Sequence, residues 1–63
     1  MVVINTKTEQ CFPNLSKTEV AKLVGVSRMT VTRWAAKNLK EGRNTEEYNN
    51  FTIYFRASNV TLV

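Results

Sequence analysis

The strongest pattern in the sequence is a one-sided apolar stripe with the spacing of an α-helix. Val20 and Val24 lie four residues apart and therefore share one helical face. Ser16 and Glu19 precede the stripe with the spacing of a capping box, in which each side chain accepts a hydrogen bond from the other residue's backbone N–H. Gly25 follows and can adopt the left-handed conformation that commonly ends a helix. The pattern predicts a short first helix between Ser16 and Gly25.

A second helix is predicted directly after the first, because the same signals repeat. Ser27 is a second N-cap residue, and Val31 and Trp34 follow it at helical spacing, which places Trp34 in the core. We expect this helix to end near Asn38, since asparagine tolerates the left-handed conformation. Only residues 25–27 join the two helices, and so short a turn favours a steep crossing, as in a helix-turn-helix.

The last third of the chain has the period of a β-strand rather than of a helix. Residues 51–55 alternate in polarity, and we expect their three apolar side chains to face the helices. Turn-forming residues are frequent over 42–50, which is predicted to be a loop. The apolar segments 2–4 and 60–63 are also β-prone, and as exposed strands they would offer a route to pairing between subunits.

Basic charge is concentrated in the segment that contains the two predicted helices. The chain carries nine Lys and Arg residues and five acidic residues, all of them Glu, for a net charge of +4. Residues 15–43 hold seven of the basic and two of the acidic residues, a surplus of five. Such a concentration favours an anionic partner, either nucleic acid or an anionic membrane surface. The alternative is a charged surface that only keeps the protein soluble.

The residue types that most catalytic sites need are missing from the sequence. There is no His and no Asp, which excludes a Ser-His-Asp triad and a His-carboxylate metal site. A single Cys excludes a zinc cluster and an internal disulfide, and two Gly leave no Gly-rich phosphate loop. We therefore expect a protein that is not an enzyme and that uses no cofactor, metal or small-molecule substrate.

The sequence has no segment that predicts a secreted or membrane-bound protein. Its aliphatic runs are far too short to span a bilayer, and residues 1–4 lack the basic region of a signal peptide. The lone Cys11 fits a reducing compartment. We expect a cytoplasmic protein with no membrane partner.

The stretch from Lys17 to Ala36 resembles the helix-turn-helix of DNA-binding regulators. That motif has a small residue in the first helix, glycine in the turn and apolar residues around both. Here these positions are occupied by Ala21, Gly25, Val20, Val24, Val26, Val31 and Trp34. The alternative for this stretch is a pair of amphipathic helices from an unrelated small bundle.

A second resemblance concerns residues 53–60, which are similar to the wing strand and following cap of MerR-like regulators and small excisionases. Asn59 stands here in place of their usual Asp. The resemblance implies an α+β fold of the small winged helix-turn-helix type, with two core helices and a short antiparallel sheet or wing. It implies one DNA-binding domain over 1–63, with the helix-turn-helix at 16–38 and the wing and strand region at 40–63.

The helix-turn-helix resemblance implies that the second helix enters the major groove of double-stranded DNA. The implied base contacts are Arg28, Met29, Thr32 and Arg33, and the implied DNA-backbone contacts are Ser16, Lys17, Thr18, Ser27, Lys37 and Arg43. Arg28 is the strongest candidate, because a guanidinium pairs bidentately with guanine O6 and N7, and Met29 is a candidate for contact with a thymine methyl group. Lys22 lies outside this predicted reading face.

The function favoured by these features is sequence-specific binding of double-stranded DNA by a transcriptional regulator of the repressor kind. One alternative is an excisionase-like factor that bends DNA for recombination, with a mobile-element setting by analogy. Another is a module that uses the same fold to bind a protein. A single module of this size buries little DNA surface, and we therefore expect a homodimer or a cooperative multimer on DNA.

Overall fold

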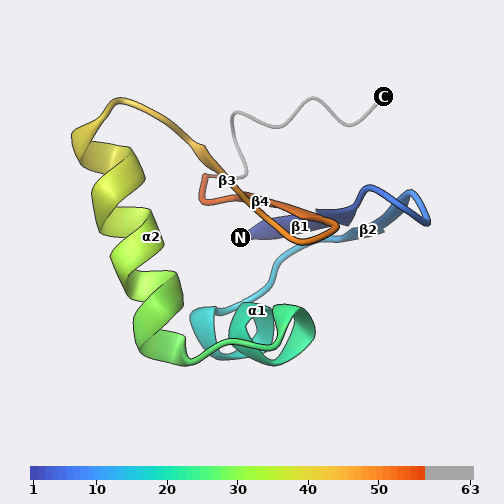
Figure 1. The fold of residues 1–63 in the computed structure, drawn as a ribbon. Coiled ribbons are helices and arrows are strands. Elements are labelled where there is room, and N and C mark those ends of the chain that lie inside the picture. The colour runs from blue at the N-terminus through green and yellow to red at the C-terminus, as the bar shows by residue number, and fades with distance from the viewer. Residues whose placement is uncertain (57–63) are drawn as a thin grey trace.

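The structure is a computed structural model that describes residues 1–56. Its elements are, in chain order, β1 (Val2–Asn5), β2 (Gln10–Phe12), α1 (Lys17–Val24), α2 (Arg28–Lys40), β3 (Thr45–Tyr48) and β4 (Phe51–Tyr54) (Figure 1). The predicted α+β class with two helices and an antiparallel sheet is confirmed, and the sheet has four strands. The β-prone segment 60–63, for which the sequence leaves strand and helix open, and most of the predicted cap after β4 lie outside the described residues.

The N-terminal strand β1 lies inside the sheet and not at its edge. The strand order is β2-β1-β4-β3, and every neighbouring pair is antiparallel. Val3 is opposite Phe12 of β2 on one side and Ile53 of β4 on the other. The expectation that segment 2–4 is exposed for pairing between subunits is therefore wrong, because both of its edges are already paired within the chain.

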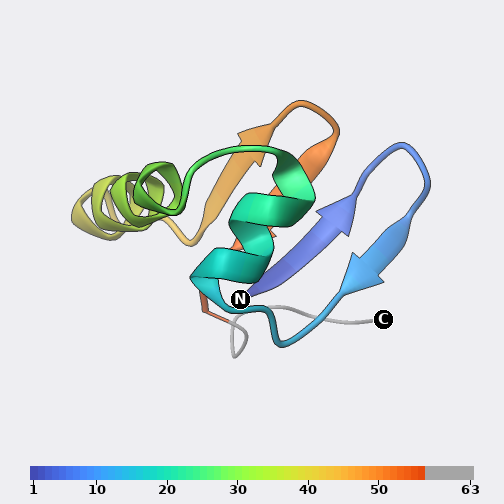
Figure 2. The ribbon, with the colours of Figure 1, turned by 90° about the horizontal axis from the view of Figure 1, so that it is seen from below.

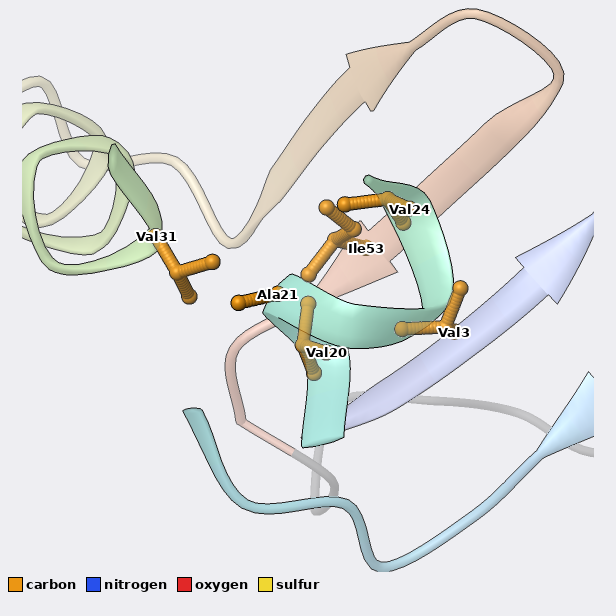
Figure 3. Packing of buried hydrophobic residues seen from close by; sticks show 6 residues of the cluster. All are labelled: Val3, Val20, Ala21, Val24, Val31 and Ile53. Carbon is orange, nitrogen blue, oxygen red and sulfur yellow. The ribbon is translucent and has the colours of Figure 1, made fainter. Parts of the chain in front are cut away.

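The hydrophobic core lies between α1, one face of the sheet and the first turns of α2. The buried side chains that form it are Val3, Val20, Ala21, Val24, Val31 and Ile53 (Figure 3). Figure 2 shows α1 lying across β1 and β4, the strands that carry Val3 and Ile53. Phe51 and Phe55 pack against this cluster, so the inward face predicted for residues 51–55 is confirmed.

Helix α1 begins and ends as its sequence predicts. The Glu19 N–H donates to Ser16 Oγ at 3.2 Å, and the Ser16 N–H donates to Glu19 Oε1 at 3.0 Å, which completes the capping box. Gly25 has a φ of +81°, in the left-handed region. The N–H groups of Gly25 and Val26 both donate to the Ala21 carbonyl oxygen, at 2.9 and 3.0 Å. All of these contacts join residues within five positions of each other.

The capping box predicts a pH dependence of stability. The hydrogen bond from the Ser16 N–H, followed by the one with the Ser16 side chain, holds the pKa of Glu19 below its ordinary value of 4.5. The carboxylate therefore stabilises the fold above that value, and the contribution is lost as pH falls through the lower folded-state pKa. We expect Glu19→Gln to lower the melting temperature at neutral pH, and this difference to be lost as the pH falls from neutral through the folded-state pKa of Glu19. A melting-temperature difference that stays constant across this range would contradict the assignment.

Helix α2 continues to Lys40, and the predicted end near Asn38 is wrong. The Asn38 side chain is only 2% exposed, and its Nδ2 donates to the Trp34 carbonyl oxygen and to Glu46 Oε1, each at 2.8 Å. A residue that tolerates a helix end is thus held inside the helix by a partner on β3. The left-handed residue that follows the helix is Gly42, with a φ of +73°.

The segment 42–50 is not a single loop, because residues 45–48 form β3. This strand pairs with β4 through a turn at Asn49 and Asn50, and Asn49 has a φ of +53°. The Tyr48 ring lies 5.2 Å from that of Trp34, measured between centroids, which ties the strand to α2. The predicted loop therefore reduces to a short connection after α2 and a tight turn at the tip of a hairpin.

Candidate nucleic-acid interface

Four of the predicted DNA-contact residues line one surface depression. Lys17 belongs to α1, and Arg28, Met29 and Thr32 belong to α2. The depression has a volume of about 480 Å³ and is open to solvent. Three predicted base contacts and one predicted backbone contact are thus brought together, although Lys17 and Arg28 are eleven positions apart in the sequence. The tertiary arrangement of the two helices creates this grouping.

The two N-caps determine how these side chains are placed. Ser16 and Ser27 cap α1 and α2, so that Lys17 and Arg28 are the first residues of their helices. The N-terminal end of a helix carries a partial positive charge and unpaired backbone N–H groups. The first turn of α2 contains no acidic residue that would offset this charge. The depression therefore combines two cationic side chains with the N-terminal ends of two helices, and at α1 the carboxylate of Glu19 in the first turn offsets part of the positive charge.

The hydroxyl groups near the depression serve the helices themselves. Ser27 Oγ accepts from the Thr30 N–H at 3.2 Å and lies 2.9 Å from Thr30 Oγ1. Thr32 Oγ1 donates to the Arg28 carbonyl oxygen at 3.2 Å. Ser16 Oγ accepts from the Glu19 N–H within the capping box. In this structure Ser16 and Ser27 thus act as N-caps. The groups that line the depression and can bind an anion are the long side chains of Lys17 and Arg28.

The remaining predicted contacts lie elsewhere on the surface. Thr18 and Arg33 are exposed but do not line the depression, and Arg33 Nη2 lies 3.7 Å from Met29 Sδ. Lys37 and Arg43 line a second depression of about 350 Å³, between the end of α2 and β3. Glu46 and Glu47 line it too, so its charge is mixed. The structure therefore separates Lys37 and Arg43 from the basic group at the helix N-termini.

Helix α2 carries only basic charge. Its 13 residues include Arg28, Arg33, Lys37 and Lys40 and no acidic residue. Lys40 is exposed and is not among the predicted contacts. Two of the exposed residues on this helix are large and apolar, namely Met29 (63% exposed) and Leu39 (58% exposed). The outer surface of α2 is thus basic with apolar positions between the charges.

The β3–β4 hairpin is fixed to the side of α2. Figure 1 shows α2 standing beside the sheet, with α1 near its start and β3 following from its end. The hydrogen bond between Asn38 and Glu46 and the ring contact between Trp34 and Tyr48 join α2 to β3. Asn38 is buried, and leaving its amide without a hydrogen-bond partner would cost free energy. Its hydrogen bond to Glu46 therefore favours the observed position of the hairpin against α2.

Comparisons with known proteins found no matching family model, no similar curated protein and no similar solved structure. Within residues 1–56, none of the helices has the length and apolar character needed to cross a membrane. Over the same residues, no three His, Cys, Asp or Glu side chains are grouped as a metal site requires.

Proposed function

We propose that this protein binds double-stranded DNA in a sequence-specific manner through a winged helix-turn-helix and acts as a transcriptional regulator of the repressor kind. The observation that carries the proposal is the depression lined by Lys17, Arg28, Met29 and Thr32. It lies at the N-terminal ends of two helices joined by a three-residue turn, the part of a helix-turn-helix that faces DNA.

In this proposal α2 enters the major groove with its N-terminal end at the bases. The helix has 13 residues and is therefore about 20 Å long. With side chains it is about 10–12 Å wide, which matches a major groove of about 12 Å. Arg28, at the first position of α2, reads guanine through O6 and N7. Lys17, at the first position of α1, binds a phosphate beside that base pair.

Further basic residues bind the DNA backbone on both sides of the reading end. Arg33 and Lys40 are exposed on α2, and their charge is not offset by any acid on that helix. Lys37 and Arg43 lie at the junction of α2 with the hairpin, where the wing approaches the backbone. The β3–β4 hairpin acts as the wing, held to the helix through Asn38. Two copies, as a homodimer or in a cooperative array, supply the contact area that tight binding needs.

The salt dependence of duplex binding tests this function. Each phosphate contact lowers the logarithm of the affinity by about 0.9 for each unit rise in the logarithm of salt concentration. Contacts from Lys17, Arg33, Lys37, Lys40 and Arg43 predict a slope of about −4.5 for each copy. The measurement is fluorescence anisotropy of a labelled random-sequence duplex at several salt concentrations. A protein that binds no duplex at low salt does not have the proposed function.

A further inference from the structure

We propose that the depression lined by Lys17, Arg28, Met29 and Thr32 recognises the C5-methyl group of a thymine within two base pairs of the guanine read by Arg28. This inference rests on the proposed DNA-binding function and names the base that the site selects. Its basis is the composition of the depression, which combines two cationic side chains with the exposed Met29 and with Thr32.

Met29 supplies the large apolar side chain of the depression. Its side chain is 63% exposed, and its sulfur lies 3.7 Å from Arg33 Nη2. Thr32 is three positions further along α2, so the two side chains are neighbours on the helix surface. Leu39 is exposed to a similar degree on the same helix but does not line the depression. Met29 is therefore the large apolar side chain of α2 that faces the predicted reading site.

Thr32 adds a methyl group rather than a hydrogen-bond donor. Its hydroxyl hydrogen is used by the bond from Oγ1 to the Arg28 carbonyl oxygen, at 3.2 Å. A threonine side chain with its hydroxyl turned back to its own helix leaves the γ-methyl as its remaining surface group. Met29 and Thr32 together thus present apolar surface, next to the guanidinium donors of Arg28 and Arg33.

The thymine methyl is the apolar group that base edges present in the major groove. Arg28 and Thr32 are four residues apart, a rise of about 6 Å along the helix. This rise covers about two base-pair steps of 3.4 Å. Arg28 and this apolar surface can therefore contact a guanine and a thymine that lie within two base pairs of each other. The two cationic side chains that line the depression favour a polyanion over an apolar peptide as the occupant.

Replacing thymine by deoxyuridine tests the inference, because the change removes only the methyl group. The duplex is first obtained by selection from a random pool, and each thymine of the selected site is then replaced in turn. We expect about fourfold weaker binding at one or two positions, as burial of a methyl-sized group predicts. Met29→Ala should abolish the difference between the two duplexes, and Met29→Leu should retain it. Leu39→Ala is the matched control and should also retain it.

Three other outcomes are distinguishable. Equal binding of the thymine and deoxyuridine duplexes at every position would overturn the inference and leave the DNA-binding function intact. A difference that survives in Met29→Ala would also overturn it, since another residue would then contact the methyl group. Failure to bind any duplex would refute the proposed function itself. Far-UV circular dichroism of each variant shows whether the fold is retained, as we expect for these exposed positions.

Discussion

Replacing Ile53 by alanine is expected to unfold a large part of the protein population at physiological temperature. Ile53 is fully buried at the centre of the sheet, opposite Val3 of β1 and within the cluster covered by α1. Truncation of a buried isoleucine to alanine costs about 2–5 kcal/mol, because apolar contacts are lost and a cavity remains. A domain of this length has a total stability of only about 3–9 kcal/mol. The substitution thus removes a large share of it.

Thermal unfolding followed by far-UV circular dichroism and by Trp34 fluorescence measures this loss. Trp34 is the single tryptophan of the chain and lies against Tyr48, so its fluorescence reports the contact between α2 and β3. We expect the melting temperature of Ile53→Ala to fall by about 10 °C or more. Leu39→Ala, at a position that is 58% exposed, is the control and should change stability by no more than about 0.5 kcal/mol. Equal melting temperatures for the two variants would contradict the described core.

Replacing Arg28 by alanine is expected to weaken binding of the selected duplex by about 5- to 150-fold. This range corresponds to the roughly 1–3 kcal/mol of one bidentate arginine–guanine contact. Preference for one base should also be lost at a single position of the site. The fold should be retained, since the Arg28 side chain is exposed at the start of α2. Titrations against duplexes that vary each base pair in turn give both quantities.

Two further variants show whether Arg28 reads a base or only neutralises a phosphate. Arg28→Lys keeps the charge but not the planar pair of donors, so it should keep most of the salt dependence and lose the base preference. Lys22→Ala removes a cation from the last turn of α1, away from the residues that line the depression, and should have little effect. If Lys22→Ala weakens binding more than Arg28→Ala, the proposed orientation of α2 on DNA is wrong.

The features that could be predicted from the sequence depend on residues close together in the chain. The capping box of Ser16 and Glu19 and the left-handed Gly25 operate within a few positions, and the structure has both. The inward face of residues 51–55 follows from the period of a strand and needs no knowledge of its partner. Both helices and the clearest strand were therefore predictable from local signals alone.

The predictions from the sequence are wrong where a contact with another element overrides the local preference of a residue. Asn38 has the properties of a residue at a helix end, but its bond to Glu46, eight positions away, keeps it inside α2. Residues 45–48 lack a strong strand pattern and become β3 through pairing with β4. Residues 10–12 form β2 in the same way, by pairing with β1.

The sequence by itself determined the two helices, their caps and the concentration of basic charge, because each of these depends on neighbouring residues. Only the tertiary structure decided that β1 is central, that a hairpin is fixed to α2, and that Lys17 joins Arg28, Met29 and Thr32 around one depression. The physical reason is that these features depend on contacts between residues that are separated in the sequence. Such contacts are made by strand pairing, by the buried hydrogen bond of Asn38 and by the crossing of the two helices, and local propensity does not predict them. The surface on which the proposed function depends was therefore assembled by packing, from residues whose local roles the sequence had already defined.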